Sequence, residues 1–516
     1  MWGRSRAGGT PPFGAAAWFA AVLLVAVPAA GQVGPLPRYA QPAGATAPVP
    51  PAGPEIRLTL PEAVYLGLRR NRAVKSAYLQ RVLDKYDLTV AESLLSPKGV
   101  LLAGINADRT GTARTADATL TPVVQMLTPL GTSISFAWDA VQSGRRQKGG
   151  NSLTGQSSLS LTVIQPLLRG AGPDVTLAPV REARLRERYN QLRLKAAVAD
   201  TVTAIAGAYH RFIQARQQIV LAKAALKRAR ELEATNRALI AAGRMAEIDL
   251  AQAQSSVSVQ ELGVLQAENA FDSARLALLS LLALDLHTRI VPADTLTARP
   301  VRVEVETVRG LAFENRPDYL AQMVSIESAR IGLDVARNQQ LWDLSLVVGV
   351  NAPGAGRTAW GATTALPDTK TDLRAGIQLS IPLNNPAIKQ QEVQAAVGLR
   401  QSEVQLEQLR TQVDQQVRDA ARTLDTAWRQ YTLSRQVREL AQKTLDSETV
   451  KLRAGRSSNF QVVTFQDQLR AAENGELTAL VAYLDALIAL DQTVGATLDT
   501  WGIQLNDDGA VPEGRP

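Results

Sequence analysis

The sequence predicts a mostly helical protein with a membrane-embedded β region. Two tandem repeats are expected, each with two strands and long coiled-coil helices. Three observations predict this class: short motifs recur in the same order in both halves of the chain, long segments carry a narrow apolar seam at helical spacing, and other segments alternate apolar and polar residues. The chain has 516 residues, 46% of them hydrophobic, which is enough for two or three domains.

Three pairs of motifs indicate the duplication. They are Asn71-Arg72 with Asn315-Arg316, Gln165-Pro166-Leu167 with Ile381-Pro382-Leu383, and Ala242-Gly243-Arg244 with Ala454-Gly455-Arg456. The offsets are 244 (315 − 71), 216 (382 − 166) and 212 (455 − 243) residues, so the first copy carries about 28 extra residues in its strand region. We place the first repeat at 57–300 and the second at 301–499.

Each repeat is expected to follow one plan. A short helix (roughly 60–95, then 307–340) leads into strands (about 98–166, then 343–383). A long helix follows (roughly 177–241, then 386–453), and a glycine turn leads into a medium helix (roughly 246–284, then 459–498). The helical hairpins therefore cover 176–284 and 386–498.

The long helices carry a narrow seam. Its residues step by 4, 3, 4 and 3 positions: Val198, Val202, Ile205, Tyr209 and Phe212. Such a seam with polar flanks is typical of helices in a single-layer wall, touched on two sides only. A helix of 65 residues spans about 100 Å at 1.5 Å per residue, so we expect two antiparallel hairpins of about that height per protomer.

The strand segments alternate as a membrane barrel wall requires. Leu101, Ala103 and Ile105 share one face, and Gly104 and Asn106 the other. Two strands per copy give four per chain, too few to close a barrel, whereas three chains would give twelve. The extra stretch around 123–138 alternates too and indicates an added hairpin. The sequence leaves open whether this hairpin extends the barrel or forms a surface loop.

The ends of the chain carry other signals. Arg4, Arg6 and the apolar stretch from Phe13 to about Val27 indicate a signal peptide over 1–30, with cleavage near Ala29 or Ala30. A membrane anchor is the alternative. Residues 31–56 are expected to form a Pro-rich disordered linker and 500–516 a disordered tail. No apolar run of 18 residues follows the leader, so no membrane helix is expected.

Composition excludes several function classes. The chain has no cysteine, which excludes disulfides, zinc thiolate sites and a lipoprotein anchor. Its two histidines, His210 and His287, have no metal-ligand partner at helical spacing, so no metal, cofactor or catalytic residue is expected and the protein is not expected to be an enzyme. The net charge of +8 comes from basic residues interleaved with acids, which argues against nucleic-acid binding.

The chain resembles the TolC-like outer membrane efflux family over roughly residues 58–498. The resemblance rests on the duplication, the strand ends Gln165–Gly170 and Ile381–Leu383, and the glycine tips Ala242–Leu250 and Ala454–Val462. It implies a homotrimer with a twelve-stranded barrel in outer membrane lipid and a twelve-helix periplasmic tunnel. It also implies a periplasmic adaptor and an inner-membrane transporter, in a tripartite efflux or type I secretion system that the subunit serves as a passive exit duct.

The resemblance also suggests two sites. The hairpin tips, with Gly243, Arg244, Gly455, Arg456 and Ser457, would dock the adaptor, although solvated turns would look the same. Family members often carry aspartates where the tunnel narrows, and this chain has Gln461 and Thr464 there. With Gln468 these share one helix face, which suggests a neutral polar constriction.

Two rival classes stay open at this point. A periplasmic adaptor also has a coiled-coil hairpin, but only one, between compact β domains. A soluble structural coiled coil would lack the alternating strands. The cargo, whether drug, metal ion or polypeptide, cannot be assigned from the sequence.

Overall fold

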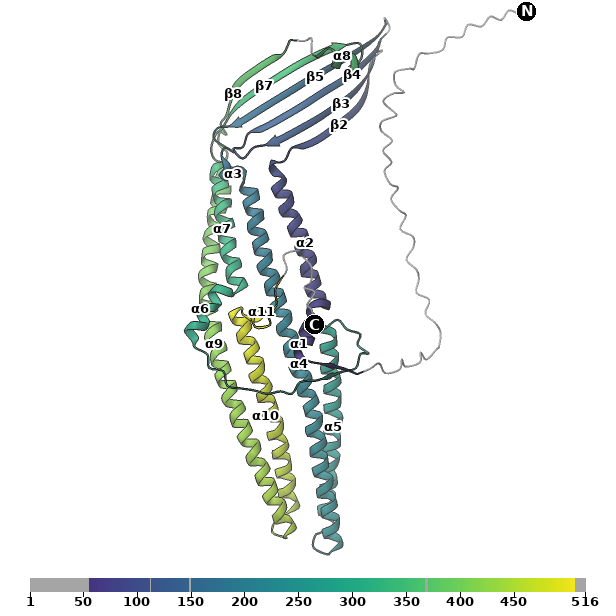
Figure 1. Cartoon of the computed structure of the whole chain (residues 1–516), viewed down its shortest axis with the longest axis vertical. Coiled ribbons are helices and arrows are strands. Elements are labelled where there is room, and N and C mark those ends of the chain that lie inside the picture. Colours follow the sequence, from purple (N-terminus) through teal and green to yellow (C-terminus); the bar gives the residue numbers. More distant parts are fainter. Residues whose placement is uncertain (1–54, 112, 148–149, 367–369, 506–516) are drawn as a thin grey trace, which may run out of the picture. The chain divides into compact units, whose positions relative to one another are not determined.

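The computed structural model describes residues 55–111, 113–147, 150–366 and 370–505. The predicted signal peptide, nearly all of the predicted linker and residues 506–516 of the predicted tail lie outside them. Within residues 55–505, one large sheet lies at one end of the long helices, and the turns between paired long helices lie at the other end (Figure 1).

The helices occur in the predicted order and nearly at the predicted residues. The first copy contains α1 (Leu60–Arg70), α2 (Arg72–Glu92), the 3₁₀ turn η1 (Ser93–Leu95), α3 (Pro173–Thr176), α4 (Ala178–Ala241) and α5 (Ile248–Leu281). The second contains α6 (Val305–Asn315), α7 (Pro317–Asn338), α8 (Ala359–Thr364), α9 (Pro386–Arg453), α10 (Asn459–Val494) and α11 (Thr497–Thr500).

The short helix of each copy is split in two at equivalent places. The Asn71 side chain accepts hydrogen bonds from the backbone N–H groups of Ala73 and Val74, so it starts a new helix where α1 ends. In the second copy Pro317 opens α7, and the preceding Arg316 has the extended backbone that a following proline favours. The Asn-Arg motifs that indicated the duplication are therefore helix breaks.

Among the described residues the larger sheet is antiparallel and contains six strands, in the order β2, β3, β4, β5, β7 and β8. Their bounds are Lys98–Thr110, Ala113–Leu127, Ser133–Gln147, Gly150–Pro166, Asp343–Gly356 and Asp372–Ser380. The expected two strands per copy hold for the second copy only. The added hairpin, β3 and β4, lies inside the sheet, so the first copy supplies four strands and the expected total of four per chain is wrong.

The main core lies where the first copy's helices meet the connection between the copies. The predicted seam is confirmed, since Val198, Val202, Ile205, Tyr209 and Phe212 are all buried. Beside it β1 (Ile56–Leu58) pairs in parallel with β6 (Ile290–Pro292). The Tyr209 hydroxyl oxygen lies 2.7 Å from the Leu58 carbonyl oxygen and 2.9 Å from an Asp294 carboxylate oxygen, the two acceptors available to its one proton, and burial raises the pKa of this tyrosine.

The end of the described chain belongs to this core. Trp501, Ile503 and Leu505 pack against it, and Leu498 of α11 is buried in it. Residues 500–505 were expected in the disordered tail, and this boundary is wrong. Their alternate apolar side chains pack against the core to which α1 and α4 contribute. The sequence pattern of the tail does not indicate this contact.

Among the described residues one helix, α10, is long and apolar enough to cross a membrane by length and composition. Buried core helices also meet this measure, so the expectation that the chain has no membrane helix stays a prediction. In the structure Tyr483, Leu490 and Val494 of α10 are buried in a core shared with Leu424 and Ala427 of α9. The apolar character of α10 thus serves packing between helices.

Candidate functional site

The sheet has one apolar and one polar face. Directly paired residues of antiparallel strands point to the same side, so the register assigns every side chain. The apolar face carries Leu101, Ile105, Val124, Phe136, Leu159, Leu161, Val350, Leu373 and Ile377, in continuous register across all six strands. Four of these side chains are between 65% and 76% exposed: Leu101, Ile105, Leu373 and Ile377.

The polar face is built from the alternate residues. It carries most of the threonines, serines and amides of the sheet, for example Asn106, Thr119, Ser135, Ser160 and Gln378. All acidic residues of the six described strands also lie on this face: Asp108, Asp117, Asp139, Asp343 and Asp372. The pattern fits a wall between lipid and water, as the alternation in the sequence predicted.

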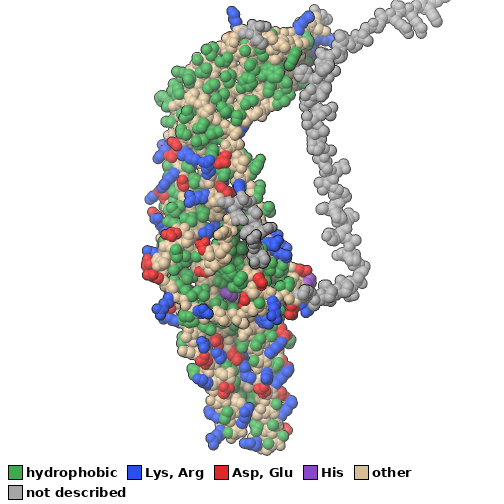
Figure 2. All heavy atoms as spheres, viewed as in Figure 1, with side chains coloured by type: hydrophobic (Ala, Val, Ile, Leu, Met, Phe, Trp, Pro, Cys, Tyr) green, Lys and Arg blue, Asp and Glu red, His purple; other side chains and the backbone are tan. Residues whose placement is uncertain are grey.

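Exposed tryptophans flank the apolar surface at both of its ends. Trp342, 54% exposed, precedes β7 on the side of the helices, and Trp360, 72% exposed, lies on α8 near the opposite end. Tryptophan favours the two interfaces of a membrane, where its ring is apolar and its N–H is wet. Figure 2 shows hydrophobic side chains gathered over the sheet and charged side chains spread over the helices.

Helix α8 rests on the apolar face over a floor of glycines. A Cβ on Gly155 would lie 2.0 Å from the Thr358 carbonyl carbon, and one on Gly354 would lie 2.2 Å from the Ala362 carbonyl oxygen. The Gln142 side chain accepts from the Ala359 N–H at 2.8 Å. The absence of side chains on the floor is therefore what lets the helix backbone approach the sheet.

The two outer strands of the sheet, β2 and β8, pair on one side only among the described residues. β2 runs away from the helices and β8 runs back toward them, so β2 of one copy and β8 of another could pair antiparallel (Figure 1). Every residue of β8 is exposed. Long exposed edges with apolar side chains are templates for pairing with another chain.

At the other end of the molecule the two predicted hairpin tips lie close together. Gly243 and Gly455 adopt the left-handed backbone, with φ of 68° and 72°, that ends the long helices. The Arg244 N–H donates to the Leu239 carbonyl and the Arg456 N–H to the Lys451 carbonyl, each at 2.9 Å, so the turns are equivalent. The Arg244 guanidinium reaches the second tip, 3.7 Å from where a Cβ on Gly455 would be.

Two buried asparagines join the hairpins just behind the tips. Asn236 of α4 donates to the Asn459 side chain of α10 at 2.7 Å, and the exposed fractions of the two residues are 0% and 2%. Asn459 in turn donates to the Asp249 carbonyl at 3.2 Å and to the Gln252 side chain at 3.1 Å. This asparagine clamp, Asn236 and Asn459, has no local sequence signal, because its members lie 223 residues apart.

Ser457, a predicted docking residue, also has a structural role. Its hydroxyl donates to Glu448 at 2.6 Å, and Lys451 pairs with the other carboxylate oxygen at 2.9 Å. The Ser457 hydrogen bond, with help from Lys451, lowers the pKa of Glu448. Gly243, Arg244, Gly455 and Arg456 are exposed, whereas Ser457 is only half-buried at the base of the turn.

Two exposed apolar residues at the tips were missed. Ile248 is 77% exposed and Phe460 is 65% exposed. Each stands five positions after the tip glycine of its own hairpin, so the two occupy equivalent places. The aligned motifs already contained this signal, since a surface helix start rarely repeats a large apolar residue without a reason.

The predicted constriction residues share the first turns of α10. Gln461 closes a capping box with Ser458, accepting from the Ser458 N–H at 3.2 Å, and Thr464 donates to the Phe460 carbonyl at 2.9 Å. Gln461 and Gln468 are exposed and Thr464 is half-buried, on another side of the helix from the buried Val462 and Leu469. The three side chains therefore lie on one side of α10, beside the face that this helix packs against the core of its own chain.

The two histidines have separate surroundings. His210 Nδ1 lies 2.9 Å from an Asp485 oxygen, between α4 and α10, and His287 is exposed in the link between the copies. Within the described ranges no cluster of three or more metal-ligating side chains exists.

Residues 308–496 match the sequence profile of the family described as outer membrane efflux protein. The fold of the chain is that of several outer membrane channels, each with a TM-score of 0.63 or 0.65. The Campylobacter jejuni CmeC outer membrane channel is 15% identical, with 85% of this chain and 86% of that one covered, at a TM-score of 0.65. A comparison with curated protein sequences finds no match.

Two further solved structures have a similar fold. The outer membrane protein VceC of Vibrio cholerae is 16% identical, with 84% of this chain and 96% of that one covered, at a TM-score of 0.65. The open state of the Neisseria gonorrhoeae MtrE outer membrane channel is 15% identical, with coverages of 85% and 89%, at a TM-score of 0.63. At these identities the similarity establishes the fold.

Proposed function

We propose that the chain is one subunit of an outer membrane channel, a proposal supported by the match of residues 308–496 to the outer membrane efflux protein family. The channel conducts its cargo passively across periplasm and outer membrane. An inner-membrane transporter supplies the energy, in a tripartite efflux or type I secretion assembly.

One observation carries the proposal: the two-faced sheet with two unpaired edges. A water-soluble protein would bury the apolar face, and here it is exposed across six strands. Lipid would cover that face, but every backbone group in lipid must be paired within protein. An open six-stranded sheet leaves the outer N–H and C=O groups of β2 and β8 unpaired. Copies of the chain must therefore join edge to edge and close the sheet into a ring.

Three copies would close a barrel of eighteen strands instead of the twelve expected from the sequence, because each chain contributes six. Barrels of 16 to 18 strands leave an aqueous channel, and eight strands enclose only side chains or one small ligand. The polar face, with its serines, threonines and all of the sheet's carboxylates, would line this channel.

The helices would continue the duct on the periplasmic side. Three chains with two long hairpins each supply the helices of a tunnel, and α10 begins at its far end. There Gln461, Thr464 and Gln468 form the proposed neutral polar constriction. On this side of α10, Gln461 and Gln468 are exposed and Thr464 is half-buried, so the three side chains would be available to face the tunnel axis.

The tips would dock a periplasmic adaptor. Gly243, Arg244, Gly455, Arg456 and Ser457 form the predicted contact surface. Ile248 and Phe460 add an exposed apolar residue to each tip. A partner of matching chemistry presents a carboxylate for each arginine beside an apolar pocket. Ser457 contributes mainly by fixing the turn through Glu448.

The proposal is tested by purifying the full chain from outer membranes and recording it in planar bilayers. We expect heat-modifiable trimers that form ion-conducting channels. A protein found only as a soluble periplasmic monomer, or trimers that never conduct, would refute the proposed function.

The constriction has its own test, the Gln461→Asp variant with Gln461→Asn as the matched neutral control. A ring of carboxylates in a narrow pore favours cations, so the aspartate variant should gain cation preference and block by divalent cations, while the asparagine variant should keep the original selectivity. If both variants conduct like the original protein, these residues do not line the narrowest point.

A further inference from the structure

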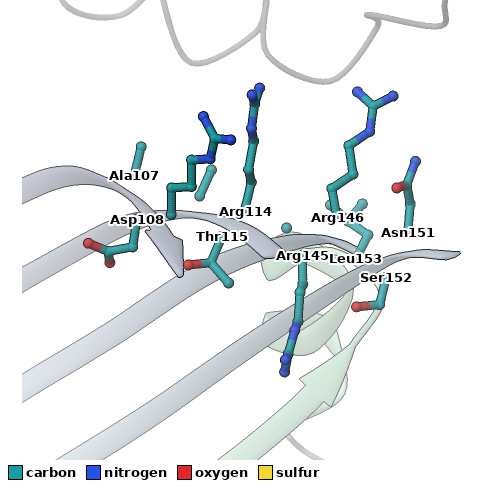
Figure 3. A pocket seen from close by; sticks show the side chains of 12 residues that line it. Ala107, Asp108, Arg114, Thr115, Arg145, Arg146, Asn151, Ser152 and Leu153 are labelled. Atoms are coloured by element: carbon teal, nitrogen blue, oxygen red, sulfur yellow. The ribbon is translucent and has the colours of Figure 1, made fainter. Parts of the chain in front are cut away.

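Three arginines form a straight row across the sheet at the end far from the helices. Arg109 of β2 pairs directly with Arg114 of β3, and Arg114 pairs directly with Arg146 of β4. Asn151 of β5, the partner of Arg146, extends the row. In Figure 3 the Arg114 and Arg146 side chains point to the same side, with Asn151, while Arg145, Asp108 and Thr115 point to the other.

The row lies on the apolar face, where no acidic residue of the described strands lies. The carboxylates of Asp108 and Asp117 are near in sequence but on the opposite face. In the part of the chain that the structure describes, none of the three arginines has an ion pair, and all three are exposed. Cβ atoms of directly opposed residues are about 5 Å apart, and like charges there repel. The sheet therefore holds three positive charges together that an external anion would stabilise.

The height of the row matches a membrane surface. Arg109 lies ten residues beyond Gly99 at the helix end of β2. At about 3.4 Å per residue and the usual strand tilt, this is about 26 Å along the membrane normal, close to the apolar band of about 25 Å in barrels of this kind. Trp360 lies on the same face near this end, where an interfacial tryptophan is expected. The guanidinium groups would thus stand at the level of lipid headgroups.

The surface around the row is hollowed. A depression of about 520 Å³ is lined on the apolar face by the three arginines and Asn151 together with Ala107, Ala116, Gly144 and Leu153. It is also bordered by residues whose side chains point to the polar face, namely Asp108, Thr115, Arg145 and Ser152. Leu153 is 49% exposed and lies one row nearer the apolar surface. The charged groups lie at the end of the sheet far from the helices, and the apolar groups lie nearer its middle. This order matches a molecule whose phosphate groups adjoin its acyl chains. Guanidinium forks bind phosphate oxygens in pairs, with strong charge-assisted hydrogen bonds.

From this geometry we propose that Arg109, Arg114 and Arg146 bind the phosphate groups of a phosphorylated glycolipid in the outer leaflet. The inference rests on the proposed function, because it requires the apolar face to lie in the outer membrane. The bound lipid would neutralise the row and seal the rim of the barrel against its surroundings.

The test measures binding of lipid A carrying two phosphates to the purified full-length protein in nanodiscs. The triple variant Arg109→Gln, Arg114→Gln, Arg146→Gln is compared with the single variant Arg145→Gln. Arg145 is the matched control because it is adjacent in sequence and points to the opposite face. We expect the triple variant to bind about tenfold more weakly or worse, and the control to bind as the original protein does.

Two added arms identify the ligand chemistry. Dephosphorylated lipid A should bind the original protein as weakly as lipid A binds the triple variant, and inorganic phosphate at millimolar concentration should not displace lipid A. The proposal is overturned if the triple variant binds normally, if Arg145→Gln weakens binding equally, or if inorganic phosphate alone competes, which would indicate a free-phosphate site.

Conductance of the same preparations separates this inference from the proposed function. The triple variant should still form conducting trimers, since the row lies outside the polar lining. If the original protein conducts but binds no lipid A, the lipid site is refuted and the channel stands. If it neither conducts nor enters membranes, the proposed function itself fails.

Discussion

At the scale of single residues, the asparagine clamp fixes how the two hairpins meet at their tips. Asn236 and Asn459 are almost fully buried, and the Asn236 side-chain amide donates to the Asn459 side-chain oxygen across α4 and α10. Buried amides that lose a partner are costly, about 1–3 kcal/mol for each unsatisfied group. The clamp therefore adds specificity: only one register of α10 against α4 brings the two amides together.

Replacement of Asn459 by alanine should loosen the tips. It removes the hydrogen bonds to Asn236, Asp249 and Gln252 and leaves the Asn236 amide unsatisfied, which predicts a loss of about 1–3 kcal/mol in local stability. Hydrogen exchange at the first turns of α5 and α10 measures it. Asn474→Ala is the control, because Asn474 bonds only within α10, to the Arg470 carbonyl. Equal exchange in both variants would contradict the clamp.

The tip turn should also respond to acid. The pKa of Glu448 is held below its ordinary value of 4.5, chiefly by the Ser457 hydroxyl and then by Lys451. A lowered carboxylate pKa contributes stability that is complete above 4.5 and is lost as the pH falls through the folded-state pKa.

We therefore expect protection of the amides in the α9–α10 turn to be constant at neutral pH and to fall only below 4.5. Hydrogen exchange corrected for its intrinsic pH dependence provides the measurement. In a Glu448→Gln variant this acid transition should vanish. A transition that persists in that variant would assign it to another group.

The sequence predicted part of the tips and missed part. Gly243 and Gly455 were recognised because a turn after a long helix needs a left-handed residue, and both have positive φ. The clamp could not be predicted, since nothing near Asn236 marks its distant partner. Ile248 and Phe460 could have been found, because they stand at equivalent positions of the aligned repeats.

At the scale of elements, α8 depends on its glycine floor. A Gly155→Ala variant would place a Cβ 2.0 Å from the Thr358 carbonyl carbon, so α8 must move away. We expect faster limited cleavage by trypsin at the exposed Arg357, which precedes α8.

A second alanine variant provides the control for that experiment. Gly376→Ala lies on β8, where a Cβ would have open space, so cleavage at Arg357 should keep its original rate. If Gly155→Ala leaves the rate unchanged too, α8 is not held by the floor.

Helices were more predictable than strands for a physical reason. Helical periodicity and caps are local, so the bounds of α4 and α9 follow from the sequence almost to the residue. Alternation along β3 and β4 was equally visible, but the partner of a strand is a long-range property. The sequence therefore indicated the added hairpin without telling that it enters the sheet between β2 and β5.

At the scale of the whole molecule, both the sheet and the helical hairpins leave surfaces unpaired in a single chain. The sheet exposes an apolar face and two edges, and the hairpins bury one narrow seam per helix instead of a round core. Each feature becomes favourable when copies of the chain stand side by side around an axis. The same proposed arrangement would place the arginine row at the outer rim and the tips at the opposite end, so lipid, cargo and adaptor would meet different parts of one ring.

The joining of β2 to β8 between copies is tested most directly by cysteine cross-linking, because the chain has no cysteine of its own. Ala103 of β2 and Ala375 of β8 are exposed on the apolar face. In the experiment both are changed to cysteine in one chain, and outer membranes that contain this variant are treated with a short bismaleimide. Each single-cysteine chain is the control and should stay uncross-linked. The account predicts cross-linked species of two and three chains and none larger. Absence of cross-linked species, or a ladder that stops at two or continues past three, would contradict it.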